Sequence, residues 1–169
     1  MGPQPQADSD AAIEGRVLAA LDALGADYQT LRIDPDHADT ATFCRVHGYA
    51  AEDAGNCILV RSRGEEPRYA ACVVAASRRL DVNRTVRRLL GVRKASFAPM
   101  EDAEAVTGMR SGGVTPFGLP EGLPVYVDAH LLGRERVVVG GGSRALKIVV
   151  DPEVFARAPF ATVVEDLAR

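Results

Sequence analysis

The chain has 169 residues, a formal net charge of −3 and 47% hydrophobic residues. This length suits a single domain with its own core, and no apolar run is long enough to cross a membrane. Its three cysteines have no C-x-x-C spacing, which excludes a zinc ribbon and a disulfide framework and suits a reducing cytoplasm. We expect a disordered leader over residues 1–8 and one cytoplasmic domain over residues 9–169.

Charge is distributed unevenly along the chain. Residues 1–54 carry ten acidic and three basic residues, whereas residues 78–94 carry seven basic residues and one acidic residue. The basic stretch is either a solvated helix face or a surface for an anionic partner such as nucleic acid. The side chains expected to contact phosphates are Arg84, Arg87, Arg88 and Lys94.

The first third of the chain predicts a helix, a strand and a second helix. Apolar residues recur at spacings of three and four between Ile13 and Leu24, and Gly25 ends this helix. A strand is predicted over 28–33, and a short helix begins after Asp39 and ends at Gly48.

Two apolar segments, 56–61 and 69–75, then predict a β-hairpin whose strands lie centrally in a sheet. A helix follows from Asp81 to Gly91, a short strand at 95–98 and another helix at 101–106. Further strands are expected over 124–127, 136–139 and 146–150, and a helix begins near 151–153. The order predicts an α+β fold with a mixed, curved, barrel-like sheet of about seven strands and flanking helices.

Ser111–Pro120 holds three glycines and two prolines in ten residues. Such a loop brings backbone N–H groups close to a ligand, although composition alone favours a tight turn. A second run, Gly140–Gly142, is followed by Ser143 and a strand. It therefore fits neither a P-loop nor a dinucleotide fingerprint, and no cofactor or metal is expected.

Side chains with catalytic chemistry are scattered. His37, His47 and His130 show no triad spacing, and we expect them on the surface. Cys57 is expected to be a small buried hydrophobe rather than a nucleophile. Asn56 opens an apolar strand, where its amide either orients a ligand or caps the preceding turn.

These segments together resemble the YbaK/prolyl-tRNA-synthetase-associated editing domain family. The resemblance runs from about Val17 to Val164, and its most specific part is Thr107-Gly108 with Gly-Gly-Val-Thr-Pro-Phe-Gly-Leu-Pro at 112–120. It implies a trans-acting aminoacyl-tRNA deacylase with a mixed barrel-like sheet. The implied partners are the acceptor end of aminoacyl-tRNA and, as a further candidate, a synthetase.

The family's Gly-x-x-x-Pro loop corresponds to Gly112–Pro116. The resemblance implies that its backbone holds the aminoacyl carbonyl while a hydroxyl of the terminal ribose assists water, without a protein nucleophile. The catalytic residues are then Gly112, Gly113, Val114, Thr115 and Pro116. The residues expected to bind substrate are Tyr28, Asn56, Asp128, Gly142 and Ser143.

One position departs from the family pattern. Active members carry a lysine where this chain has Asn56, and an amide cannot replace the Coulomb attraction of an ammonium for phosphate. The alternative hypothesis is therefore a catalytically weakened or inactive module that binds tRNA or aminoacyl-adenosine.

Overall fold

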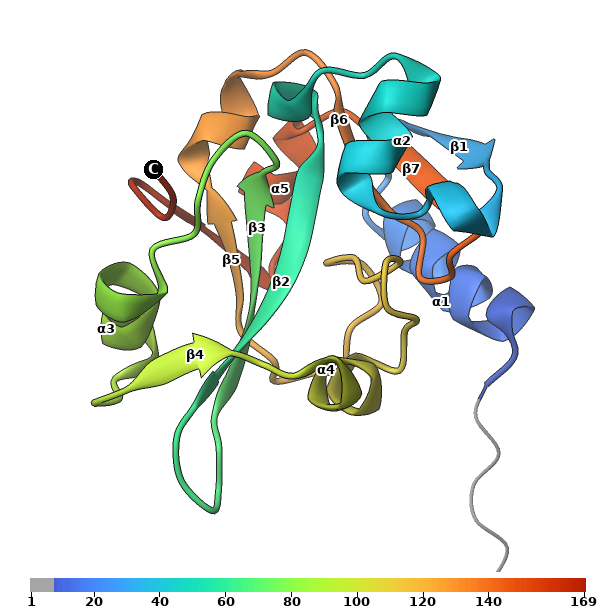
Figure 1. Ribbon diagram of the computed structural model, residues 1–169. Helices are drawn as coiled ribbons and strands as arrows, with labels where there is room; N and C mark the ends of the chain where they lie inside the picture. The colour runs from blue at the N-terminus through green and yellow to red at the C-terminus, as the bar shows by residue number, and fades with distance from the viewer. Residues whose placement is uncertain (1–7) are drawn as a thin grey trace, which may run out of the picture.

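The computed structural model describes residues 8–169 as two β-sheets with five α-helices around them (Figure 1). The smaller sheet has the order β1 (Tyr28–Arg32), β7 (Leu146–Val150), β6 (Val137–Gly140). The larger sheet has the order β4 (Ala95–Phe97), β2 (Gly55–Ser62), β3 (Tyr69–Ala75), β5 (Val125–Asp128), β8 (Ala161–Val164). The predicted α+β class with a mixed sheet is confirmed, although the strands form two sheets rather than one closed barrel.

The predicted hairpin is present in the larger sheet. β2 and β3 pair antiparallel from Gly55 opposite Ala75 to Arg61 opposite Tyr69. β5 adds to β3 in parallel and β8 adds to β5 in parallel, which makes this sheet mixed. The sequence did not predict β8, because it is a four-residue edge strand without a fully buried residue.

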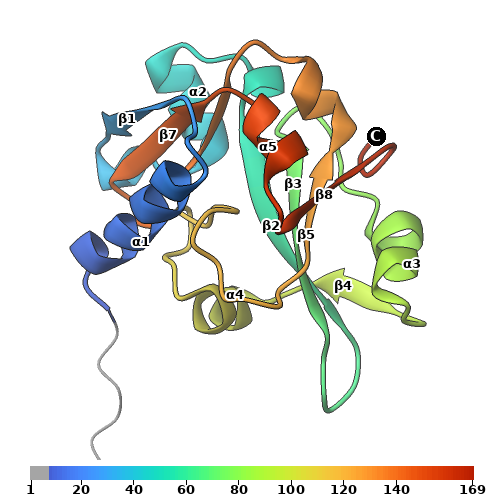
Figure 2. The ribbon, with the colours of Figure 1, turned by 180° about the vertical axis from the view of Figure 1, so that it is seen from behind.

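The main core lies between the two sheets. The cluster joins alternate residues of β7 (Leu146, Ile148 and Val150) to Val73 of β3 and Val127 of β5. α1 (Asp10–Ala23) closes one side with the predicted apolar stripe, and its first turn is capped by Ser9. Figure 2 shows α1 beside β7, and α5 (Glu153–Arg157) beside β8.

Helices cover the outer face of each sheet. α2 (Thr40–His47) places Phe43 over Val138 and Val149 of the smaller sheet. The helical segment 82–90, which ends in α3 (Arg87–Leu90), packs on the larger sheet, and α4 (Met100–Thr107) follows β4.

The helix predicted from Asp81 occupies the predicted residues but begins differently. Its first turn, Val82–Val86, is π-helical, and the Asp81 carboxylate accepts the Thr85 hydroxyl instead of a backbone N–H. Gly91 was predicted to end this helix, and it does so in the left-handed conformation typical of a glycine at a helix C-terminus.

Residues 1–7 of the expected leader lie outside the described residues, and Asp8 forms an ion pair with Arg16. Within residues 8–169, no helix has the length and apolar character needed to span a membrane.

Candidate active site

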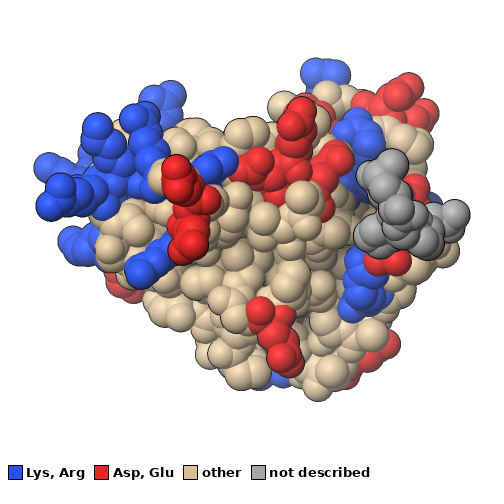
Figure 3. Space-filling view, turned by 90° about the horizontal axis from the view of Figure 1, so that it is seen from below, with Lys and Arg blue, Asp and Glu red and all other residues tan. Residues whose placement is uncertain are grey.

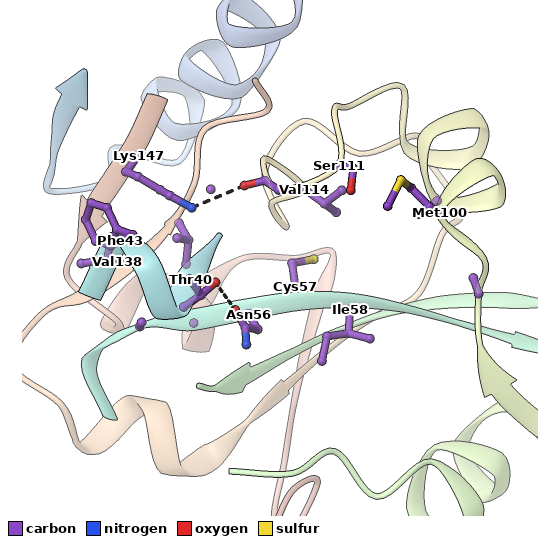
Figure 4. Close-up of a pocket in the computed structure, with 17 residues that line it drawn as sticks. Thr40, Phe43, Asn56, Cys57, Ile58, Met100, Ser111, Val114, Val138 and Lys147 are labelled. Atoms are coloured by element: carbon purple, nitrogen blue, oxygen red, sulfur yellow. Dashed lines mark hydrogen bonds between the residues drawn. The ribbon is translucent and has the colours of Figure 1, made fainter. Parts of the chain in front are cut away.

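A cavity of about 330 Å³ opens where the start of β2 meets β6 (Figure 4). The two strands touch there, since a Cβ placed on Gly55 would lie 3.2 Å from both Val137 and Val139. Four further segments complete the wall, namely α2, β7, the start of α4 and the glycine loop. The lining side chains labelled in Figure 4 are Thr40, Phe43, Asn56, Cys57, Ile58, Met100, Ser111, Val114, Val138 and Lys147.

The glycine loop can form only with glycine at two adjacent positions. Gly112 has φ +86°, and a Cβ added there would lie 2.6 Å from an Arg144 nitrogen. A Cβ on Gly113 would lie 2.2 Å from the backbone oxygen of Ser143, closer than non-bonded atoms approach. Two backbone hydrogen bonds, from Arg110 N–H to Gly142 O and from Gly142 N–H to Gly113 O, hold the two glycine-rich loops together. The loop is therefore a rigid wall rather than a flexible turn.

Only part of this loop is available to a ligand. The Gly113 N–H already donates to Arg110 O at 2.8 Å, and the Ser111 N–H donates to Glu104. Gly112 and Val114 line the cavity, and their N–H groups donate to no other residue within 8–169. These two amides are the backbone donors that a ligand oxygen can use.

Asn56 faces the same cavity as the glycine loop, with its amide held in a defined orientation. Its Oδ1 accepts the Thr40 hydroxyl at 2.5 Å (Figure 4). The NH₂ group of Asn56 donates no hydrogen bond within residues 8–169, and its carbonyl oxygen keeps one further lone pair. An uncharged amide thus stands where the resemblance expects an ammonium.

Cys57 and the histidines do not supply an activated nucleophile or a base. Burial raises the pKa of the Cys57 thiol to about 12, so it stays protonated at neutral pH. None of the described residues that line the cavity is a histidine. Within residues 8–169, no group of three or more His, Cys, Asp or Glu side chains could hold a metal ion.

Lys147 lines the cavity from β7, and the sequence analysis did not identify it. It is 6% exposed and lies over the Phe43 ring at 5.5 Å. Desolvation lowers the pKa of its ammonium below the usual lysine value. A charged residue inside the apolar run Leu-Lys-Ile-Val-Val is the signal in the sequence that could have found it.

Four residues predicted to bind substrate lie outside the cavity lining. Tyr28 donates its hydroxyl to Asp22, and Asp128 is buried with Arg78 Nε 3.2 Å from its carboxylate. Gly142 packs behind the glycine loop against Ile13, and buried Ser143 donates to Glu14. The fold does not bring these four residues to the cavity, and their part in substrate binding stays a prediction.

The five loop residues predicted to be catalytic do not all line the cavity. Gly112 and Val114 line the cavity, whereas Gly113, Thr115 and Pro116 are buried behind it. The Thr115 hydroxyl is buried without a hydrogen-bond partner among the described residues. These three residues shape the wall, and the surface that a ligand meets is provided by Gly112 and Val114.

The predicted phosphate contacts form a separate surface. Arg84, Arg87, Arg88 and Lys94 are all exposed. Arg87 and Lys94 also line a shallow depression with Arg63 and Arg93. Figure 3 shows Lys and Arg side chains gathered at its left, the side on which Figure 1 shows α3 and β4. We call the exposed residues Arg63, Arg84, Arg87, Arg88, Arg93 and Lys94 the basic surface.

A comparison with protein families identifies residues 34–158 as an aminoacyl-tRNA editing domain. This chain belongs to that family. The match covers well over half of the sequence and includes β2, β6 and all four further wall segments of the cavity, the glycine loop among them.

Two curated proteins are similar to this editing domain. The uncharacterized protein YwhH of Bacillus subtilis is 32% identical over 107 residues, covering 63% of this chain and 67% of YwhH. The "Putative Cys-tRNA(Pro)/Cys-tRNA(Cys) deacylase EbsC" of Enterococcus faecalis is 27% identical over 81 residues, covering 48% of this chain and 49% of EbsC. This second match thus spans about half the length of the relative.

Solved structures share the fold of the editing domain. The crystal structure of hypothetical protein APE2540 has a TM-score of 0.80 and 24% identity, covering 91% of this chain and 99% of that one. A structure described as "a putative trans-editing enzyme for prolyl tRNA synthetase" has a TM-score of 0.74 and 25% identity, covering 93% and 98%.

Proposed function

We propose that this protein is a trans-acting aminoacyl-tRNA deacylase that hydrolyses the ester of mischarged tRNA. The observation that carries the proposal is the joint placement of the Gly112 and Val114 amides, the Asn56 amide and Lys147 around one cavity. Family membership and the name of the relative EbsC support this reaction class.

In the proposed reaction, the Gly112 and Val114 N–H groups hold the ester carbonyl and stabilise the negative charge that develops on its oxygen. Preorganised backbone donors of this kind are worth several kcal/mol of barrier in other acyl-transfer enzymes, about 3–4 for one donor. Water attacks with help from a hydroxyl of the terminal ribose, as the family resemblance implies. The high thiol pKa of Cys57 agrees with a mechanism that needs no protein nucleophile.

The basic surface would hold the tRNA backbone beside the cavity. Lys94 belongs to this surface, and Met100 lines the cavity. Six residues of chain span at most about 20 Å, so the two sites are close enough for one acceptor end to reach both.

Hydrolysis tests the proposal directly. Labelled aminoacyl-tRNAs are incubated with the protein, beginning with Cys-tRNA(Pro) and Cys-tRNA(Cys), the substrates in the name of EbsC. We expect faster release of the amino acid than in buffer for at least one mischarged tRNA. Absence of any acceleration at stoichiometric protein would exclude the deacylase.

The second candidate is a binding module, and the specific observation that favours it is Asn56 in place of the expected lysine. Calorimetry with a non-hydrolysable aminoacyl-adenosine would then show binding without turnover. The variant Asn56→Lys separates the two hypotheses: a large gain of hydrolysis indicates that the natural chain has lost activity, and no gain favours a native deacylase that works with an amide.

A further inference from the structure

The cavity wall holds an ammonium group that the mechanism above does not use. Lys147 Nζ donates to Ala38 O at 2.8 Å. It also donates to Gly112 O at 3.4 Å (Figure 4). An ammonium has three N–H donors, so one of them has no acceptor among residues 8–169. That donor is available to a ligand in the cavity, which Lys147 lines.

The charge of Lys147 also lacks an ion-pair partner. No carboxylate within residues 8–169 forms a salt bridge with it. Asp39 at the start of α2 and Cys44 within it favour the charged form, and Arg144 in the neighbouring loop opposes it. None of the three forms a hydrogen bond or salt bridge with Lys147 among residues 8–169. An unpaired buried charge is costly, and buried cations in proteins normally meet an anion. The missing anion is therefore expected to come from a ligand.

Lys147 and Asn56 each form a hydrogen bond with the segment that leads into α2. Lys147 is tied to Ala38, and Asn56 is tied to Thr40, two residues further along at the start of α2. Met100 marks the open side, because its side chain is 64% exposed. Lys147 and Asn56 thus supply a charged and a neutral side chain to the cavity wall beside α2.

We infer that Lys147 is the anion-binding residue of this cavity, and that it holds a phosphate or carboxylate oxygen of the bound aminoacyl-tRNA end. The inference rests on the proposed function, because that function supplies the ligand. The inference extends the proposed function by locating the positive charge of the site. The resemblance places this charge at position 56 on β2, whereas the inference assigns it to Lys147 on β7. The anionic oxygen belongs either to the terminal nucleotide or to the side chain of an acidic amino acid.

Calorimetry with paired ligands tests the inference without requiring hydrolysis. The first pair is 5′-AMP and adenosine, which differ by the phosphate. The second pair is 3′-amide-linked aminoacyl-adenosine carrying glutamate or glutamine, which differ by the carboxylate. We expect the natural protein to prefer the anionic member of one pair by about 10- to 100-fold, as for a buried charge-assisted hydrogen bond.

Lys147→Met should reduce that preference to about one, because it removes the charge while keeping a long apolar side chain. A lysine that only braces the loop through Gly112 would weaken both members of a pair alike and leave their ratio unchanged. Arg45→Met, which removes an exposed charge from α2, is the matched control and should retain the preference. Circular dichroism and thermal melting establish that each variant is folded.

Each outcome decides the inference. Loss of the AMP preference in Lys147→Met identifies a phosphate site, and loss of the glutamate preference identifies a carboxylate site. If neither anionic ligand is preferred by the natural protein, or if Lys147→Met keeps the preference, the inference is wrong. The hydrolysis assay tests the proposed function separately. A protein without deacylase activity can still show a Lys147-dependent ratio of affinities for the paired ligands, and an active deacylase can lack it.

Discussion

The cavity and the basic surface carry positive charge in opposite ways. In the cavity a single ammonium, Lys147, is buried at 6% exposure and held by two backbone carbonyls. The basic surface presents six exposed cations on and beside α3 and β4. Exposed charges act at long range and are screened by salt, whereas a buried charge is barely screened and acts only on the atoms that it touches. The basic surface is therefore suited to attract a polyanion and the cavity to select one group on it.

The largest effect should come from the backbone contact that builds the cavity wall. In Gly113→Ala the new Cβ would meet the Ser143 carbonyl oxygen at 2.2 Å, and this backbone atom cannot move aside cheaply. We expect a loss of about 1–3 kcal/mol in unfolding free energy and a hundredfold or greater loss of hydrolysis. Denaturant unfolding and single-turnover deacylation measure these two effects.

Gly15→Ala is the matched control for that substitution. Gly15 lies in α1 with no atom near the position of an added Cβ, so alanine should stabilise the helix by about 0.5–1 kcal/mol. Normal activity in Gly113→Ala would show that the wall is soft and that the cavity is not the site.

Salt should weaken the binding of a ligand to the basic surface but not its binding in the cavity. Replacing Arg84 and Arg88 with glutamine removes two exposed charges, and we expect the slope of log affinity for tRNA against log salt to fall by roughly 0.7–0.9 per charge. Affinity for aminoacyl-adenosine should stay constant, because that ligand reaches only the cavity.

Filter binding across a salt series measures the slope, with Arg45→Gln as the single-charge control on α2. An unchanged slope in the double variant would remove the basic surface from the tRNA path and leave its arginines as a solvated helix face.

A smaller effect is expected at the neutral donor of the cavity. Thr40→Val removes the hydroxyl that fixes the Asn56 carbonyl oxygen at 2.5 Å, so the amide can rotate. The loss of one such hydrogen bond corresponds to about 0.5–1.5 kcal/mol, or roughly a two- to tenfold fall in kcat/KM. Thr42→Val, at a hydroxyl that contacts Asp39 outside the cavity lining, should leave kcat/KM unchanged.

The smallest effect concerns stability and pH. Burial lowers the pKa of Lys147 in the folded protein, while Asp39 and Cys44 raise it and Arg144 lowers it further. At pH values between the lowered pKa of Lys147 in the folded protein and about 10.4, the ordinary lysine pKa, the unfolded chain binds more protons at this lysine than the folded chain does. The unfolding free energy of the natural protein should therefore rise with pH, relative to Lys147→Met, across this window.

Urea unfolding of both proteins at several alkaline pH values measures the difference. Cys44 and Arg144 are present in both proteins, so their direct titration largely cancels. A constant difference across the window would show that Lys147 is not desolvated in solution.

The site illustrates how far local sequence signals reach. Asn56 and the Gly112 loop were identified from composition and resemblance, and the fold brings them to one cavity. Asp128, Gly142 and Ser143 were chosen from the same kind of signal, but in the structure they pack against Arg78, Ile13 and Glu14. The sequence shows that a polar residue lies at the end of a strand. It does not show which neighbouring residue forms a hydrogen bond or an ion pair with it.

The sequence by itself determined the hairpin of β2 and β3, the stripe of α1, the glycine loop and the family, because each depends on residues close together in the chain or on a recognisable motif. Tertiary structure alone decided the division into two sheets and the place of Lys147 in the cavity wall. Both faces of β7 are covered, with Leu146 and Ile148 in the core between the sheets and Val149 under Phe43. A strand buried on both faces has no polar alternation, so only packing shows that its one charged side chain faces the cavity.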